Sequence, residues 1–329
     1  MKTRATKRPT KRDSVLVGVD IGGTKVLAGL VSSRGKVLHS ARVPMVARKS
    51  ARQGLQAVFD ALDAVFRNPR AKRARAIGVS VPGWVDSARG VLHSAPNIPC
   101  WRDFPLAREI RRRYRLPAGI ENDANAGALA EAAWGAGAKF ADVFYVTVGT
   151  GIGVGIVLRG RLCSGRTGGA SEGGHVTIDL HGPRCGCGKR GCIEAFASGT
   201  AIARRARELL DKPSARHSKT LSAAGGRIEA VTAEHVASAA RQGDRLAKCI
   251  LNEAADYFAV WLGSVIDMLE PGVIVIGGGM APLMMSLLPR IRRGLGTWAA
   301  NPRHGEIPIV RARFGADSAL IGAASLTIK

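Results

Sequence analysis

Residues His175 to Glu194 read HVTIDLHGPRCGCGKRGCIE, which brings one histidine and three cysteines into eighteen residues. One imidazole and three thiolates form a closed tetrahedral set for zinc, typical of a structural rather than a catalytic site. The interleaved glycines permit the sharp turns that such a loop needs. The pattern predicts a structural zinc site, here called the Cys–His knot (residues 175–192), with the ligands His175, Cys185, Cys187 and Cys192. A disulfide or three idle thiols would leave the histidine and the CxC spacing unexplained.

Two carboxylates, Glu172 and Glu194, flank the knot on either side. A metal-bound loop that holds two carboxylates in place is expected to shape a polar pocket. Glycine-rich turns occur elsewhere in the chain, at Asp20–Lys25 (DIGGTK), Gly149–Gly153 (GTGIG) and Gly277–Gly279. Their backbone N–H groups can point at phosphate oxygens, and the hydroxyls of Thr24 and Thr150 add donors. Together they favour a nucleotide site, although the spacing is not that of a Walker loop.

Composition narrows the class of protein. The 329 residues suit two lobes, and 46% hydrophobic residues with 41 glycines favour a glycine-looped α/β protein over a disordered one. No apolar run approaches the roughly 20 residues of a membrane span. The apolar run after the basic start ends at Asp20, too soon for the core of a signal peptide. Outside the knot, Cys100, Cys163 and Cys249 show no pairing pattern, which favours a reducing, cytoplasmic location.

The charge is strongly positive, with 49 Lys and Arg against 25 Asp and Glu and a net charge of +24. Three stretches contribute most: the tail of residues 1–13, which we expect to be disordered, the run Arg70–Arg75, and the stretch Arg108–Arg115. Such an excess attracts polyanions, nucleic acid, nucleotide or polyphosphate. It is also compatible with an ordinary solvated surface, since aromatic residues are not interleaved with the runs.

Strand and helix patterns alternate along the chain. Strands are predicted at Val15–Val19 and Val26–Val31, as an antiparallel hairpin, then at Ala76–Val81, Asp142–Val148, Gly153–Leu158 and Val273–Ile276. Helices are predicted at Leu55–Phe66, Ala124–Trp134, Ala254–Leu269 and Asp317–Leu326.

Five motifs in this order resemble the ROK family of sugar kinases and repressors. They are DIGGTK from Asp20, VPG from Val81, ENDAN from Glu121, GTGIG from Gly149, and the His175 block with its CxCGxxGCxE pattern. The resemblance covers residues 15 to about 327, and the chain looks most like the bacterial glucokinases. It implies a two-lobed, actin-like (ribonuclease-H-like) α/β fold with the active site between the lobes. The expected lobes are residues 14–123 plus 315–329 (small) and 124–314 (large).

The resemblance also implies the reaction and its residues. ATP would phosphorylate the 6-hydroxyl of glucose, with Mg²⁺ as cofactor, and Asp123 would be the general base; the rival interpretation of Asp123 is a simple helix N-cap. The implied sugar-binding residues are Gly83, Asn97, Asn122, Asp123, Glu172, His175 and Glu194, with Asn125 a weaker choice. The expected nucleotide and magnesium residues are Asp20, Gly22, Gly23, Thr24, Lys25, Gly149, Thr150, Gly151, Gly277, Gly278 and Gly279. A homodimer or homotetramer is also implied.

The chain departs from the family pattern beside one sugar-binding residue. Where the family usually reads AGEIGH, this chain has Ala170-Ser-Glu-Gly-Gly-His, so Ser171 replaces a glycine and Gly173 an apolar residue. A looser loop would admit another sugar, such as an N-acetylated hexosamine. The open alternatives are therefore a kinase for another hexose or N-acetylhexosamine, a polyphosphate-dependent glucokinase, and a sugar-responsive repressor. An intact Asp123 and the lack of a DNA-reading domain argue against the repressor.

Overall fold

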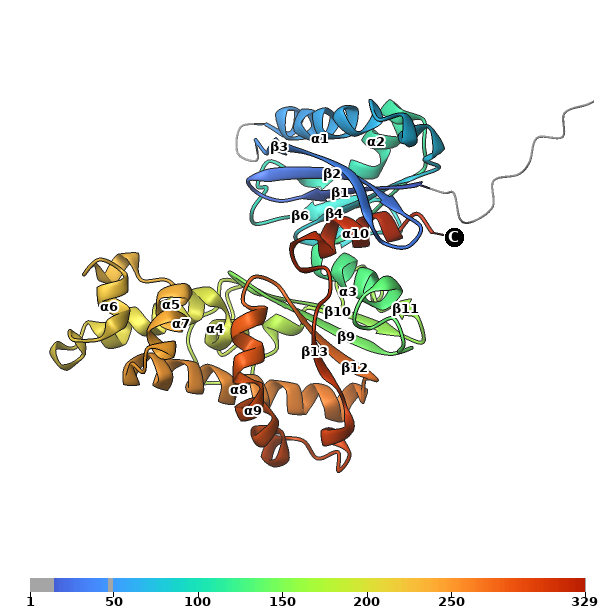
Figure 1. Cartoon of the computed structure of the whole chain (residues 1–329). Helices are drawn as coiled ribbons and strands as arrows, with labels where there is room; N and C mark the ends of the chain where they lie inside the picture. Colours follow the sequence, from blue (N-terminus) through green and yellow to red (C-terminus); the bar gives the residue numbers. More distant parts are fainter. Residues whose placement is uncertain (1–14, 47–49, 329) are drawn as a thin grey trace, which may run out of the picture. The chain divides into compact units, whose positions relative to one another are not determined.

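A computed structural model describes residues 15–46 and 50–328 (Figure 1). The residues divide by their contacts into two units, one of residues 15–46, 50–139, 155–171 and 316–328, the other of residues 140–154 and 172–315. The basic tail falls outside the described residues. The sequence predicts a first lobe that ends at Asp123, whereas the contacts place the helix that begins there and residues 155–171 in the first unit. The lobe boundaries drawn from the sequence stay a prediction.

The first unit is built on a five-stranded sheet of order β3-β2-β1-β4-β8. Its strands are β1 (Val15–Ile21), β2 (Lys25–Ser32), β3 (Val37–Pro44), β4 (Ile77–Val81) and β8 (Ala118–Asn122). The predicted hairpin is confirmed, because β1 and β2 pair antiparallel with Ile21 opposite Val26. Strands β1, β4 and β8 are parallel neighbours, so their carboxyl ends lie along one edge of the sheet.

Helices cover this sheet. They are α1 (Ala51–Phe66), η2 (Pro69–Arg73), α2 (Leu106–Tyr114), α3 (Asp123–Trp134) and α10 (Ser318–Ser325), with η7 (Gly315–Asp317) preceding α10. Helix α10 approaches the sheet backbone so closely that a Cβ on Gly78 would lie 1.7 Å from the carbonyl oxygen of Ala323. A Cβ on Gly322 would lie 1.7 Å from the carbonyl oxygen of Ala126, on α3. The glycines therefore set how tightly α10 packs between the sheet and α3.

A smaller three-stranded sheet, β5 (Trp84–Asp86), β6 (Val91–Ser94) and β7 (Arg102–Phe104), follows strand β4. The sequence analysis did not predict it, because three- and four-residue strands separated by turns carry little periodicity. Gly83 lies in the turn that leads from β4 into this sheet, and Asn97 lies between β6 and β7.

The second unit contains most of another five-stranded sheet, of order β11-β10-β9-β12-β13. Its strands are β9 (Val143–Val148), β10 (Ile152–Leu158), β11 (Arg161–Leu162), β12 (Val273–Gly277) and β13 (Ile309–Arg311). The division between the units falls within β10. Strands β9, β12 and β13 are parallel, so the ends of β9 and β12 also share an edge.

The helices of the second unit are α4 (Glu194–Ala197), α5 (Gly199–Leu210), α6 (Lys219–Ala223), α7 (Ala233–Arg241), α8 (Arg245–Leu269) and α9 (Ala281–Trp298). Short 3₁₀ turns are η3 (Gly173–His175), η4 (Pro213–Ala215), η5 (Ile228–Ala230) and η6 (His304–Glu306). Helix α8 has the length and hydropathy of a membrane span, but its most apolar window is 56% buried within the protein. A largely buried helix of this kind is equally typical of a protein core.

Candidate functional site

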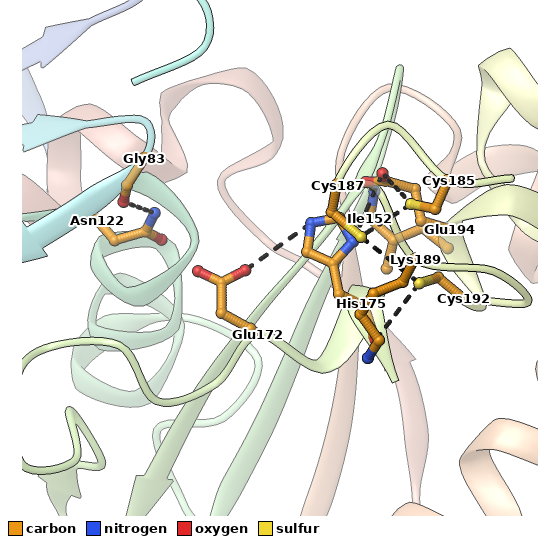
Figure 2. Close-up of polar contacts among 10 residues, drawn as sticks. All are labelled: Gly83, Asn122, Ile152, Glu172, His175, Cys185, Cys187, Lys189, Cys192 and Glu194. Carbon is orange, nitrogen blue, oxygen red and sulfur yellow. Dashed lines mark hydrogen bonds and ion pairs between the residues drawn. The ribbon is translucent and has the colours of Figure 1, made fainter. Parts of the chain in front are cut away.

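The four residues of the Cys–His knot converge. One ligand atom from each of His175, Cys185, Cys187 and Cys192 lies within 4.8 Å of all the others. His175 Nδ1 is 3.5 Å from Cys185 Sγ, and Cys187 Sγ is 3.8 Å from Cys192 Sγ (Figure 2). A tetrahedral zinc with Zn–S of about 2.3 Å and Zn–N of about 2.0 Å would separate such ligands by about 3.5 Å (S to N) and about 3.8 Å (S to S). The donor set and its spacing fit zinc.

The alternative explanations of these cysteines fit less well. A disulfide needs sulfurs about 2.05 Å apart, and all six cysteines are free thiols in the structure. Idle thiols would not gather around an imidazole nitrogen. Burial raises the pKa of Cys185 to about 12, so a cation is needed if this thiol is to ionise in such a cluster.

His175 connects the knot to the two flanking carboxylates. Its Nδ1 faces the cysteines, while its Nε2 lies 4.0 Å from Oε2 of Glu172. Oε1 of Glu194 lies 3.5 Å from Cys185 Sγ, and its Oε2 accepts a hydrogen bond of 2.9 Å from the backbone N–H of Ile152. Figure 2 shows Glu172 and the cysteines on opposite sides of the imidazole ring. The ring can thus bind a metal through one nitrogen and offer the other to a ligand.

The turn that carries Glu172 has a tightly constrained backbone. A Cβ on Gly174 would lie 1.9 Å from the carbonyl oxygen of Ile152, and one on Gly173 would lie 2.9 Å from a methyl of Val154. The preceding residue, Ser171, has φ +68°, in the left-handed region that favours glycine. Its hydroxyl donates to the carbonyl of Cys163 at 3.2 Å, which offsets part of that strain.

In the first unit, Gly83, Asn122 and Asp123 meet at the carboxyl edge of the parallel strands. Asn122 ends β8 and caps α3, its Oδ1 accepting from the backbone N–H of Ala124 at 2.9 Å. Its Nδ2 donates to the carbonyl of Gly83 at 3.1 Å (Figure 2). Gly83 has φ +100°, and a Cβ there would lie 2.1 Å from the carbonyl oxygen of Ser94. The edge therefore fixes the amide beside the first residue of α3, Asp123.

Two carboxyl groups, Asp20 and Asp123, lie below the surface at this edge. Burial raises the pKa of Asp20 to about 6, although Ser80 donates a hydrogen bond of 2.9 Å to it; the negative charge of Asp123 adds to the increase. Burial also raises the pKa of Asp123, against the lowering effect of the backbone N–H of Ala124. Two desolvated neighbouring carboxylates are suited to accepting a proton or binding a divalent cation.

The first glycine turn lies beside this pair. The backbone N–H of Gly22 donates to the carbonyl of Lys25 at 2.8 Å, closing the turn between β1 and β2. Thr24 and Lys25 have exposed side chains. Gly23 packs against Asn97, since a Cβ there would lie 2.9 Å from that of Asn97. The structure thus brings the expected phosphate turn and one expected sugar residue together within the first unit.

The other two glycine turns meet within the second unit. The backbone N–H of Met280 donates to the carbonyl of Val148 at 2.9 Å, and that of Gly199 to the carbonyl of Gly149 at 2.8 Å. The turns therefore lie at the N-termini of α5 and α9, where unpaired N–H groups favour anions. A cavity of about 610 Å³ opens here. Its lining includes Gly149, Thr150, Gly199, Thr200, Ala203, Arg207, Val231, Thr232, Ala233, Glu234, Gly279 and Met280.

Several of these site residues were missed by sequence reasoning. Thr200, Arg207 and Glu234 line the cavity but lie far from either glycine turn in the chain. One sequence signal could have indicated Thr200. Ser198 is a typical N-cap residue, and its hydroxyl accepts a hydrogen bond of 3.1 Å from the backbone N–H of Ala201, so a helix N-terminus that can bind an anion could have been predicted there. Glu121 was noted only as part of a motif, yet it is 3% exposed and accepts hydrogen bonds from Ser87, Asn122 and Asn125.

Comparison with known proteins gives one consistent family. The model of the ROK family matches residues 16–329. A glucokinase from Thermotoga maritima is 35% identical over 311 residues, covering 94% of this chain and 96% of its own length. The crystal structure of a ROK-family glucokinase from Streptomyces griseus, in complex with glucose and AMPPNP, aligns with TM-score 0.81 and 33% identity over 95% of this chain and 99% of that one.

A ROK-family transcriptional regulator, a homologue of the E. coli MLC protein, aligns with TM-score 0.85 and 27% identity. The alignment covers 97% of this chain but 79% of the regulator. The predicted actin-like sugar-kinase fold is confirmed by these structural matches. This chain belongs to the ROK family.

Proposed function

We propose that this chain is an ATP-dependent glucokinase, which transfers the γ-phosphoryl group of ATP to the 6-hydroxyl of glucose. The observation that carries the proposal is the placement of Asp123, a desolvated carboxyl at the start of α3 beside Asn122. The similar glucokinases from Thermotoga maritima and Streptomyces griseus support the substrate, and the AMPPNP complex of the second supports ATP as donor.

Asp123 is the proposed general base. A buried carboxylate with a raised pKa takes up a proton more readily than an exposed one. The dipole of α3, which begins at this residue, favours the ionised form of the carboxylate. Phosphoryl transfer asks for little covalent chemistry, so positioning and charge neutralisation provide most of the rate.

Asp20 is the proposed magnesium residue. It lies on the same edge as Asp123, and its carboxyl oxygens are the hard donors that Mg²⁺ prefers. When bound, Mg²⁺ would neutralise charge on the transferred phosphoryl group. The cavity of about 610 Å³ at the starts of α5 and α9 is the proposed nucleotide site. Its size suits a nucleoside better than a bare polyphosphate chain, for which a narrow cationic groove would be enough.

The sugar residues proposed are Gly83, Asn97, Asn122, Glu172, His175 and Glu194. Carboxylates and amides recognise pairs of sugar hydroxyls, and such a site rejects analogues that lack one of them. Zinc in the Cys–His knot would hold His175 and Glu194 in register, so its role is structural. Cytoplasmic location and a homo-oligomer are part of the same proposal.

A second function has a specific observation in its favour, namely phosphorylation of an N-acetylated hexosamine. Gly173 lies so close to Val154 that a larger side chain would not fit. The turn that bears Glu172 is therefore set nearer to β10 than an apolar residue at this position would allow. We infer that this placement of the turn would leave room beside Glu172 for a sugar with a bulkier 2-substituent.

A coupled kinase assay tests both functions. Glucose, mannose, fructose, N-acetylglucosamine and N-acetylmannosamine are each supplied with Mg-ATP, then with polyphosphate. We expect kcat/KM for glucose with ATP to exceed that of every other pair. A preference for an N-acetylated sugar would establish the second function instead, and no turnover with any pair would contradict both.

A further inference from the structure

The structure joins two of the basic runs into one surface of the first unit. The hydroxyl of Tyr114, at the end of α2, donates to Asp63 of α1 at 2.7 Å, and its ring stacks on Phe66 at 5.1 Å. Arg113 forms an ion pair with Asp63 and lies 4.7 Å over the ring of Phe59. Figure 1 shows α1 and α2 together on the side of the sheet away from α10.

Helix η2 begins three residues after Phe66, whose ring stacks on Tyr114, so its cations lie near those at the C-terminal end of α2. We call the combined surface the basic face. It consists of Arg67, Arg70, Lys72, Arg73, Arg75, Arg108, Arg111, Arg112, Arg113 and Arg115.

The cations of the basic face are available to a partner. All ten are exposed. Within the described part of the chain, two carboxylates engage them: Asp63 pairs with Arg113, and Glu109 pairs with Arg108 and Arg112. Arg111 donates to the carbonyl of Ala118 instead. The remaining six form no ion pair within residues 15–46 and 50–328: Arg67, Arg70, Lys72, Arg73, Arg75 and Arg115.

The chemistry of the basic face selects phosphate. Nine of its ten cations are arginines, whose planar guanidinium binds phosphate oxygens in pairs. None of the exposed large apolar side chains of the described residues lies on it, so it offers nothing to insert into a membrane. Its aromatic rings are partly buried against one another, so they are poorly placed for base stacking. The basic face would therefore bind a partner through the phosphate groups of that partner alone.

We propose that the basic face binds the phosphodiester backbone of duplex nucleic acid without regard to sequence. Arg108 and Arg112 lie one turn of about 5.4 Å apart on α2, and Arg115 follows at its C-terminal cap. The cations of η2 lie near this end of the helix. Exposed arginines held on two short helices suit the regularly spaced phosphates of a duplex better than a single flexible chain. This binding is independent of the kinase reaction.

The test measures the salt dependence of binding. A 20-base-pair DNA duplex of mixed sequence is titrated with the full-length chain by fluorescence anisotropy between 50 and 300 mM KCl. The variant Arg70→Gln/Arg73→Gln/Arg112→Gln/Arg115→Gln removes two cations from η2 and two from the C-terminal end of α2. Each phosphate contact adds about 0.9 to the slope of log Kobs against log salt. We expect the variant to lower that slope by about 2 to 4 and to weaken binding at 150 mM KCl at least tenfold.

A matched variant removes the same charge elsewhere. Arg34→Gln/Lys36→Gln/Lys212→Gln/Arg216→Gln changes four exposed cations outside the basic face, and we expect it to change the slope by less than 1. The half variants Arg70→Gln/Arg73→Gln and Arg112→Gln/Arg115→Gln should each produce about half of the effect, since both groups of cations are proposed to contact one duplex. Sugar phosphorylation by every variant should stay within twofold of the unmodified chain, which also shows that each variant is folded.

Three results would overturn the proposal. One is an equal loss of affinity in the basic-face variant and its matched control, which would mean that net charge alone attracts the duplex. Another is a difference that disappears when residues 1–12 are deleted from both proteins. The third is a basic face that holds inorganic polyphosphate at 150 mM KCl but not the duplex.

Discussion

Asp123 is both the first residue of α3 and the proposed general base, and the two roles can be separated. At the helix start it accepts from the backbone N–H of Ala124 at 2.9 Å, but Asn122 makes the same contact and already caps the helix. Removing the carboxylate should therefore leave the helix start intact.

The variant Asp123→Ala should lose at least 10²- to 10⁴-fold in kcat, the range expected for a lost general base. Glucose affinity, measured by calorimetry, should change by only a few-fold, because the amide of Asn122 remains in place. Asp60→Ala, which removes an exposed carboxylate on α1, is the matched control and should phosphorylate glucose normally. Retention of more than a tenth of kcat in Asp123→Ala would contradict the role of base.

Asp20 should make the stability of the metal-free protein depend on pH. Its folded pKa of about 6 exceeds the ordinary value of 3.8, so the folded state holds a proton that the unfolded state has lost between these values. The stability that this proton contributes is complete below pH 3.8 and is lost as the pH rises through 6. A shift of about two pKa units corresponds to about 3 kcal/mol.

Asp20→Asn should remove this dependence. Urea unfolding of both proteins in EDTA, compared at pH 4 and pH 7, measures it. The difference in unfolding free energy between the two proteins should favour the variant more at pH 7 than at pH 4. A difference that stays constant across this range would show that burial does not raise the pKa of Asp20.

Helix α10 illustrates how one element depends on a missing side chain. Gly78 of β4 and Gly119 of β8 are paired neighbours in the sheet. A Cβ on Gly78 would lie 1.7 Å from the backbone of α10, whereas the nearest atom to one on Gly119 is 4.0 Å away. Gly78→Ala should cost about 3 kcal/mol, and Gly119→Ala should be neutral or stabilise by about 0.5 kcal/mol. Thermal and urea unfolding measure both, and equal effects would mean that α10 is not held this closely.

A second prediction at the scale of structural elements concerns the Cys–His knot. Cys187→Ser should release the metal, which elemental analysis of the purified protein would detect, and raise the KM for glucose, because His175 and Glu194 lose their fixed positions. Cys249→Ser, outside the knot, should change neither quantity. If the variant lost its metal but kept the same KM for glucose, the knot would not position the sugar-binding residues, and the proposal would be contradicted.

The elements were predictable to the extent that local periodicity specifies them. The β1–β2 hairpin, helix α3 and strand β12 lie within a few residues of the predicted ranges, because alternating or helical spacing is a local property. The short strands β5 to β7 carry too few residues to show a period. Helix α2 was interpreted as a basic stretch, since its charged residues hide the buried Leu106, Ala107 and Ile110.

At the scale of the whole molecule, the sequence predicted contacts within one motif better than contacts between distant segments. The knot ligands are close in the chain, so their convergence could be predicted from spacing alone. Thr200 and Glu234 reach the cavity beside Gly149 only through the packing of α5 and α7, which no local pattern encodes. The union of the two basic runs likewise depends on contacts between residues about fifty positions apart, such as Tyr114 and Asp63.

The basic tail gives a prediction for the whole chain. Deleting residues 1–12 should leave kcat and KM for glucose unchanged within twofold, because every proposed site residue lies from Asp20 onward. The coupled assay on the shortened protein measures this. A large loss of kcat or a large rise in KM would show that the tail takes part in the reaction and does not merely add positive charge.

The imidazole of His175, with the cysteines on one side and Glu172 on the other, has a consequence for the cell. Sugar phosphorylation needs no zinc in its chemistry, yet the residues proposed to hold the sugar would depend on a trace element that cells ration. Under zinc starvation, newly made protein would then accumulate in a weakly sugar-binding form while its proposed ATP site remained whole. The rate of sugar phosphorylation by this protein would follow the supply of a micronutrient as well as the supply of glucose.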